Sequence, residues 1–259
     1  MIVSMPPEVP ASPARNARLR IELRPQSIFW VLLGVIALIT LLGIAGELSR
    51  NFDATDRALL PRTLRLIRRN FNPSAEQTAG AWFSTAALLV SSFLFGIIAA
   101  ASRRTGERYA THWRFLAAIA LFLSYDEATA FHEQLGDWVA RVLPTGGIFL
   151  WAWVIPYTFF AGGVMLASIS WLRALPRGTR RDILVAGVFY VGGSLGLEML
   201  QAGITDARGR GGGPVTVLAV IEETAEMIGV AYLIYALMRH IAAHTPLAVS
   251  ISASSDSDP

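Results

Sequence analysis

The sequence predicts an all-α protein, a polytopic membrane helix bundle of about six transmembrane helices. Hydrophobic residues make up 53% of the 259 residues, and charged residues make up 16%. This composition is typical of a polytopic membrane protein rather than of a soluble domain. The hydrophobic residues also gather in runs that approach the ~20 residues a helix needs to cross a bilayer. Backbone groups in lipid have to be hydrogen-bonded internally, so we expect each run to be a helix.

Five apolar runs are long enough to cross the membrane on their own. They cover residues 27–46, 82–102, 148–172, 183–205 and 215–238. A sixth run begins at Trp113, turns polar at Asp126 and is predicted to continue as one helix to about Val142. The first run follows an arginine-rich leader that lacks a clear small-residue cleavage site, which indicates a retained signal-anchor.

These helices form one predicted transmembrane domain, residues 27–240, between two segments expected to be disordered. The cytoplasmic leader, residues 1–26, is rich in proline, and the tail, residues 241–259, is rich in serine and aspartate. After the first span, residues 54–71 place apolar side chains at helical spacing opposite most of the arginines. We expect this segment to be an amphipathic helix in the outer membrane interface.

The placement of arginine predicts that both termini are cytoplasmic. The leader and the connections around residues 103–114 and 173–181 hold four arginines each, whereas the connections that alternate with them near 141 and 208–210 hold one and two. Short loops rich in arginine stay on the cytoplasmic side. All 22 basic residues are arginine, which is typical of a GC-rich bacterial genome. The expected location is therefore the bacterial inner membrane, and the lipid bilayer, not nucleic acid, is the expected partner.

Cysteine and histidine usage narrows the chemistry. The chain has no cysteine, which excludes disulfides and thiolate metal sites. His112, His240 and His244 fall at predicted cytoplasmic ends, where we expect them to be solvated. His132 is then the histidine available inside the membrane. Trp171, near a span end, is expected to be an interfacial anchor.

Three short stretches within the predicted spans, residues 121–133, 191–201 and 219–229, hold seven acidic residues. They are Asp126, Glu127 and Glu133 in the third span, Glu198 in the fifth, and Glu222, Glu223 and Glu226 in the sixth. Each ionised group placed alone at mid-bilayer would cost roughly 2.5–3.5 kcal/mol on insertion scales. We therefore expect the acids to converge on one site, together with something that neutralises them.

Depth and helical face both favour this convergence. At a rise of about 1.5 Å per residue, the acids of the three spans reach one level in the outer half of the bilayer. At about 100° per residue, Asp126 and Glu133 share a face near Thr129. The other pairs that share a face are Glu198 with Gln201 and Glu222 with Glu226.

Carboxylates from several helices, joined by an imidazole, are the ligand chemistry of iron and manganese centres in helix bundles. The sequence therefore predicts a divalent metal site for iron, manganese or zinc. The expected metal ligands are Glu133, Glu198, Glu222, Glu226, Asp126 and His132. The residues expected to surround and orient these ligands are Gln201, Thr129, Glu127 and Glu223. If the protein is an enzyme, the metal would act on a small or lipidic substrate that arrives laterally or from outside.

Two resemblances accompany these residues. The strings LSYDEATAFHE, GGSLGLEML and IEETAEMIG resemble motifs of an uncharacterised family of bacterial polytopic membrane proteins, which implies a helical membrane fold and no activity. The same three stretches partly resemble the motifs of ferritin-like, carboxylate-bridged di-iron proteins. This sequence departs from that pattern because no Glu-x-x-His occurs, and Gln201 stands three residues after Glu198 where a histidine would be expected.

Two other functions fit the same acids. Intramembrane acids serve as proton or cation relays in transporters, although no inverted repeat is visible between the halves of this chain. The acids could also be protonated and hydrogen-bonded to one another, in a structural or assembly role. The sequence leaves open which of these applies, whether the protein is an enzyme, and its oligomeric state.

The orientation can be tested with reporter fusions. Because the arginine-rich connections alternate, green fluorescent protein fused after Pro259 should fluoresce and alkaline phosphatase fused there should be inactive. Fusions after Leu143, in a predicted external connection, should give the opposite pair of results. Active phosphatase at Pro259 would contradict the predicted orientation.

Overall fold

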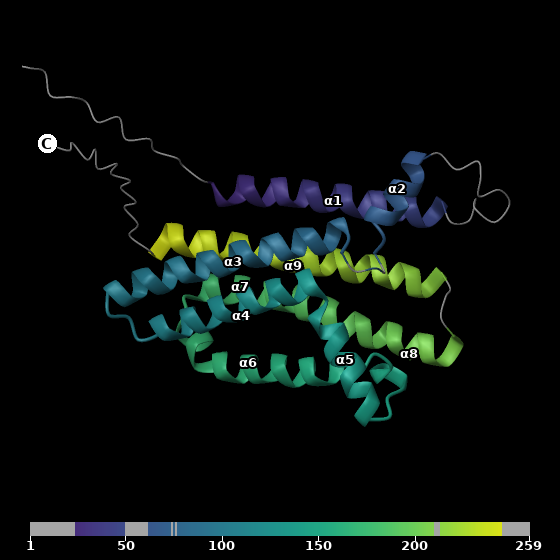
Figure 1. The fold of residues 1–259 in the computed structure, drawn as a ribbon. Helices are drawn as coiled ribbons and strands as arrows, with labels where there is room; N and C mark the ends of the chain where they lie inside the picture. Colours follow the sequence, from purple (N-terminus) through teal and green to yellow (C-terminus); the bar gives the residue numbers. More distant parts are fainter. Residues whose placement is uncertain (1–23, 50–61, 74, 76, 210–212, 245–259) are drawn as a thin grey trace, which may run out of the picture.

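The computed structural model describes residues 24–49, 62–73, 75, 77–209 and 213–244. Within these residues the chain is helical and contains no strand, which confirms the all-α class (Figure 1). Most of the predicted leader, residues 1–26, and most of the predicted tail, residues 241–259, lie outside the described residues. The described part of each segment is helical: one helix begins at Pro25 in the leader, and another ends at His244 in the tail.

The helices follow one another along the chain with short connections. They are α1 (Pro25–Ser49), α2 (Arg62–Asn70), α3 (Ala79–Arg104), α4 (Ala110–Thr129), α5 (Phe131–Val142), the 3₁₀ turn η2 (Gly147–Phe149), α6 (Val154–Ala174), α7 (Arg177–Val191), the π-helical segment η3 (Gly192–Leu197), α8 (Glu198–Arg208) and α9 (Gly213–His244). Four helical stretches of the described chain are long and apolar enough to cross a membrane: α1, α3, α6 and the continuous stretch from α7 to α8.

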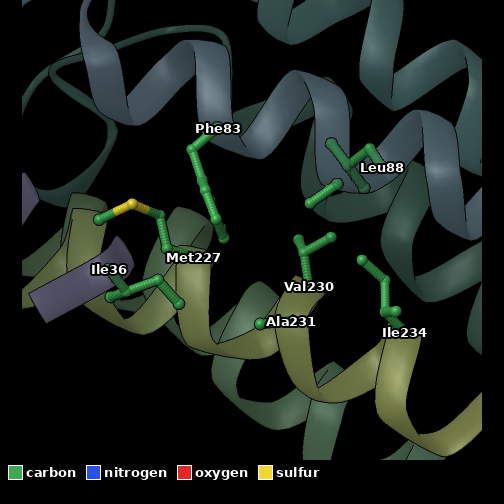
Figure 2. Close-up of a cluster of buried hydrophobic side chains, with 8 residues drawn as sticks. Ile36, Phe83, Leu88, Met227, Val230, Ala231 and Ile234 are labelled. Carbon is green, nitrogen blue, oxygen red and sulfur yellow. The ribbon is translucent and has the colours of Figure 1, made fainter. Parts of the chain in front are cut away.

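Helix α9 is the centre of the bundle and packs against α1, α3 and α7. A cluster of buried apolar side chains joins three of these helices (Figure 2). It includes Ile36 of α1, Phe83 and Leu88 of α3, and Met227 and Val230 of α9. Burying an apolar side chain of this size contributes roughly 1.5–3 kcal/mol, so this cluster holds α9 in place.

The start of α1 and the end of α9 lie at the same end of the bundle, which we call the terminal end (Figure 1). An aromatic layer fills this end. Trp171 and Trp113 are each 2% exposed, and their ring centroids lie 4.8 Å apart. His240 is 8% exposed, lies 5.1 Å from the ring of Trp113 and hydrogen-bonds to Thr179. The expectations of a solvated His240 and an interfacial Trp171 are therefore wrong, because both residues belong to this packed layer.

The third predicted span is not one helix. Helix α4 ends at Thr129, Ala130 has the left-handed backbone angles φ 48° and ψ 43°, and α5 starts again at Phe131. A residue with a Cβ in this region is strained by roughly 1–2 kcal/mol. The helical face predicted for Asp126 with Glu133 is therefore wrong, since the break reorients everything after it. The fourth predicted span, which was expected from residue 148, begins as a regular helix at Val154.

The predicted amphipathic segment, residues 54–71, is partly described. Residues 62–70 form α2, and residues 54–61 lie outside the described part of the chain. Leu64 and Ile67 are half-buried, while Arg65 and Arg69 are exposed. The helix folds back on the end of α1, where a Cβ on Gly43 would lie 2.9 Å from the carbonyl oxygen of Phe71.

The closest approach of α7 to α9 depends on Gly229. A Cβ at this position would lie 2.6 Å from the backbone nitrogen of Tyr190. Backbone cannot move aside as a side chain can, so only glycine allows this separation. Small residues at such crossings let two helices pack closely in a membrane.

Replacing Gly229 by alanine should therefore force α7 and α9 apart and destabilise the protein by about 1–3 kcal/mol. Gly96→Ala is the matched control, because a Cβ there meets no atom within 4 Å. In helix α3 that change should be neutral or stabilising by up to about 1 kcal/mol. Thermal unfolding of both purified variants measures the difference, and equal midpoints would contradict the packing argument.

Candidate functional site

A cavity of about 1220 Å³ lies among α3, α4, α5, α6, α7, α8 and α9. Nine of the ten residues singled out from the sequence line it. They are Asp126, Glu127, His132, Glu133, Glu198, Gln201, Glu222, Glu223 and Glu226. The tenth, Thr129, is not among the lining residues, and its hydroxyl donates to the Tyr125 carbonyl of its own helix at 2.8 Å. We call the end of the bundle that holds these residues, opposite the terminal end, the acid end.

Two carboxyl groups meet directly across α8 and α9. The carboxyl groups of Glu198 and Glu222 lie within hydrogen-bonding reach of each other. The side-chain amide of Gln201, one turn after Glu198, donates a hydrogen bond to Oε2 of Glu222. An ionised carboxylate only accepts hydrogen bonds, so a bond between two carboxyl groups requires a proton between them.

Glu226 lies one turn further along α9 and is surrounded by charge. Its principal electrostatic neighbours are the carboxyl groups of Glu127, Glu223 and Glu198. The imidazole of His132 acts on it with the opposite sign. The backbone of η3 comes close enough to touch it, because a Cβ on Gly193 would lie 2.9 Å from Cγ of Glu226. The same close helix crossing thus packs the bundle and brings acids from α4, α8 and α9 together.

Asp126 is held differently from the other acids. Its Oδ1 accepts hydrogen bonds from the backbone N–H of His132 at 2.8 Å and from the Tyr157 hydroxyl at 2.7 Å. Its Oδ2 lies 3.3 Å from Nδ1 of His132. At 6% exposure this carboxylate ties α4 to α5 and α6. The left-handed turn at Ala130 makes the contact possible, because it returns the first turn of α5 to the end of α4.

A π-helical segment precedes Glu198. Residues Gly192–Leu197 are wider than an α-helix, so the residues after them are rotated from their α-helical positions. Short π segments of this kind are frequent at functional sites. Ser194 and Glu198 both line the cavity. In the sequence this segment is marked only by its three glycines, and these do not by themselves specify a π-helical turn.

Sequence reasoning missed two tyrosines of the site. Tyr157 donates to Asp126, and its ring lies 5.4 Å from that of Trp153, which also packs against His132 at 4.8 Å. Tyr190 lines the cavity and interacts electrostatically with Glu127 and Glu226. Each lies in an otherwise apolar run, and a buried tyrosine hydroxyl usually has a polar partner. That pattern is the signal that could have found them.

The acids share the cavity without forming a ready ligand set. Within the described residues, no three His, Asp or Glu side chains are placed to hold one metal ion. Among the expected ligands, Glu133 is exposed and lies beyond the break at Ala130, and it is not a principal electrostatic neighbour of Glu222 or Glu226. A cation that binds here has to draw the carboxylates toward it.

Comparison with known proteins gives a family and no activity. A search of the curated proteins and of the solved structures returns no match. A family profile matches residues 30–241, which include every helix that lines the cavity. The chain therefore belongs to the family described as a domain of unknown function (DUF8692).

Proposed function

We propose that this chain is a six-span protein of the bacterial inner membrane, with both termini in the cytoplasm, that binds a divalent metal cation in its acid-lined cavity. Four apolar stretches of membrane-spanning length support the placement. The two remaining spans are α4 and α9, which carry most of the acids and pack against the apolar helix α3. Acids lower the hydropathy of these two helices. Helix α9 lies at the centre of the bundle, and Asp126 of α4 is only 6% exposed.

The close approach of the Glu198 and Glu222 carboxyl groups is the observation that carries the proposal. Two carboxyl groups so close together in an apolar bundle cannot both be ionised without a cation between them. Glu226 adds to this demand, since most of its principal neighbours are other carboxyl groups. A divalent cation can take the place of the shared proton and accept oxygen ligands from both sides.

The donor chemistry fits iron, manganese or zinc, which bind carboxylate oxygen and imidazole nitrogen. Glu198, Glu222 and Glu226 would supply oxygen. His132 would supply Nε2, because Asp126 lies against Nδ1, and a carboxylate in this position fixes the tautomer of a metal-binding histidine. Gln201, Glu127 and Glu223 would orient these ligands. Bound there, the metal would supply Lewis-acid or redox chemistry for a small or lipidic substrate.

A structural role is the alternative that the same close approach of two carboxyl groups favours. In that case a proton, not a metal, joins Glu198 to Glu222, and the acids hold α8 against α9. Transport is less well supported, because the acids gather at one end of the cavity and the lining toward Trp171 is mostly apolar.

Glu222→Gln separates the metal from the shared proton. Glutamine keeps the shape and hydrogen bonding but removes the charge, so the variant should lose the roughly one metal ion per chain expected in the wild type. At metal concentrations about 100 times Kd, this loss lowers the free energy of unfolding by about 2.7 kcal/mol. Elemental analysis and thermal unfolding measure the two effects on one preparation.

Asp206→Asn is the matched control for Glu222→Gln. Asp206 is an exposed acid in α8 that accepts a hydrogen bond from the N–H of Gly147 and does not line the cavity. The Asp206→Asn variant should retain the metal. A wild type purified without metal, together with a Glu222→Gln variant of equal or greater stability, would favour the structural role and end the metal proposal.

Asp126→Asn tests whether Asp126 orients His132. Removal of a carboxylate that orients a ligating histidine typically weakens metal binding by about 10–100-fold. Tyr157→Phe removes the other side-chain hydrogen bond to Asp126 while leaving His132 in place, so it should have a smaller effect. Competition with a chelator measures both affinities. Equal affinities for the two variants would contradict the role assigned to Asp126.

A further inference from the structure

The acids occupy only one end of the cavity. Along α6 the lining residues run from Tyr157 to Leu172, a distance of about 22 Å at the rise of an α-helix. One leaflet of a bilayer has a hydrocarbon thickness of about 15 Å. The cavity therefore extends well beyond the level of the acids and is as long as the space that one lipid chain occupies.

Below the acids the lining is mostly apolar, with Ser168 as a polar member. Phe160 and Val164 of α6 face the cavity together with Leu184 and Val188 of α7. Trp171, which belongs to the aromatic layer, lines its far end. A mostly apolar space joined to a polar end has the polarity of an amphiphile, with room for its chain and its head.

The cavity is open to the side between α6 and α7. Gly162 and Gly187 line it from these two helices, both are exposed, and a Cβ on either would meet no atom within 4 Å. In the proposed membrane orientation, this opening faces lipid at mid-bilayer depth. A chain could enter from the bilayer without crossing water.

We propose that the cavity binds a long-chain lipid with an uncharged, hydroxyl-bearing head. The hydrocarbon chain lies between α6 and α7, and the hydroxyl reaches the acid end, where Tyr157, Gln201 and the carboxyl groups offer donors and acceptors. Anionic heads are disfavoured, because carboxylates line that end and no arginine is found among the described lining residues. This inference rests on the membrane placement of the proposed function and names the substrate class of the same site.

Binding of tritiated 1-hexadecanol to the full chain in nanodiscs tests the chain site. Wild type should bind it saturably. Gly162→Leu should fill the cavity and weaken binding by at least about tenfold. Gly163→Leu is the matched control: a Cβ there also meets no atom within 4 Å, but Gly163 does not line the cavity. Gly163→Leu should bind as the wild type does.

Gly187→Leu repeats the test from the facing helix, and the thermal unfolding midpoint of each variant reports whether it is folded. Hexadecyl phosphate, which differs from hexadecanol in its anionic head, should compete at least about tenfold more weakly than unlabelled hexadecanol. The proposal is overturned if folded Gly162→Leu and Gly187→Leu both bind like Gly163→Leu. Equal competition by the phosphate overturns the assignment of the head.

Metal analysis of the same samples keeps the two proposals separate. Suppose that the wild type contains no metal but binds hexadecanol saturably, and that Gly162→Leu abolishes this binding. That result supports the lipid site and contradicts the metal proposal. A metal-loaded wild type that shows no saturable hexadecanol binding overturns the lipid site and leaves the metal.

Discussion

A carboxyl group inside an apolar bundle has to share a proton, bind a cation or accept hydrogen bonds, and the acid end of this protein is built around that requirement. Its acids meet it in two ways. Asp126 is satisfied by α5 and α6, through the His132 backbone and the Tyr157 hydroxyl. Glu198 and Glu222 satisfy each other, with help from Gln201. The first arrangement is complete as it stands, whereas the second depends on what lies between the two carboxyl groups.

The surrounding fold follows from bringing these groups together. Close approach of α7 and α9 depends on glycine at Gly229 and Gly193, and the latter also accommodates the side chain of Glu226. The π segment before Glu198 and the left-handed turn at Ala130 both depart from regular helix, and both directly precede residues of the site. Strain of this kind persists where the rest of the structure holds it. Here the apolar cluster around α9 supplies that support.

Much of this arrangement could be predicted from the sequence, because acidic side chains in apolar helices avoid lipid and therefore face the interior of the bundle. The helical class, the start of each long apolar helix within a few residues in most cases, and the selection of Glu198, Glu222 and Glu226 as neighbours needed only hydropathy and the rise of a helix. The contact of Asp126 with His132 could not be predicted, because it depends on one alanine adopting left-handed angles. The direction of the Glu198 side chain could not be predicted either, because helical periodicity assumes that every turn is α-helical. The burial of His240 and Trp171 was missed because position near a span end does not distinguish a lipid-facing ring from one packed in a layer.

The direct contact of Glu198 with Glu222 is the central claim, and a double-mutant cycle measures it most directly. Free energies of unfolding are needed for the wild type, Glu198→Gln, Glu222→Gln and the double variant. A reference cycle pairs Glu198→Gln with Asp206→Asn and is measured in the same way. Residues that share a hydrogen bond typically show a coupling energy of about 0.5–3 kcal/mol, whereas independent sites add within about 0.3–0.5 kcal/mol. We predict coupling in that range for Glu198 with Glu222 and additivity for the reference pair. Additive effects for Glu198 and Glu222 would contradict a shared site.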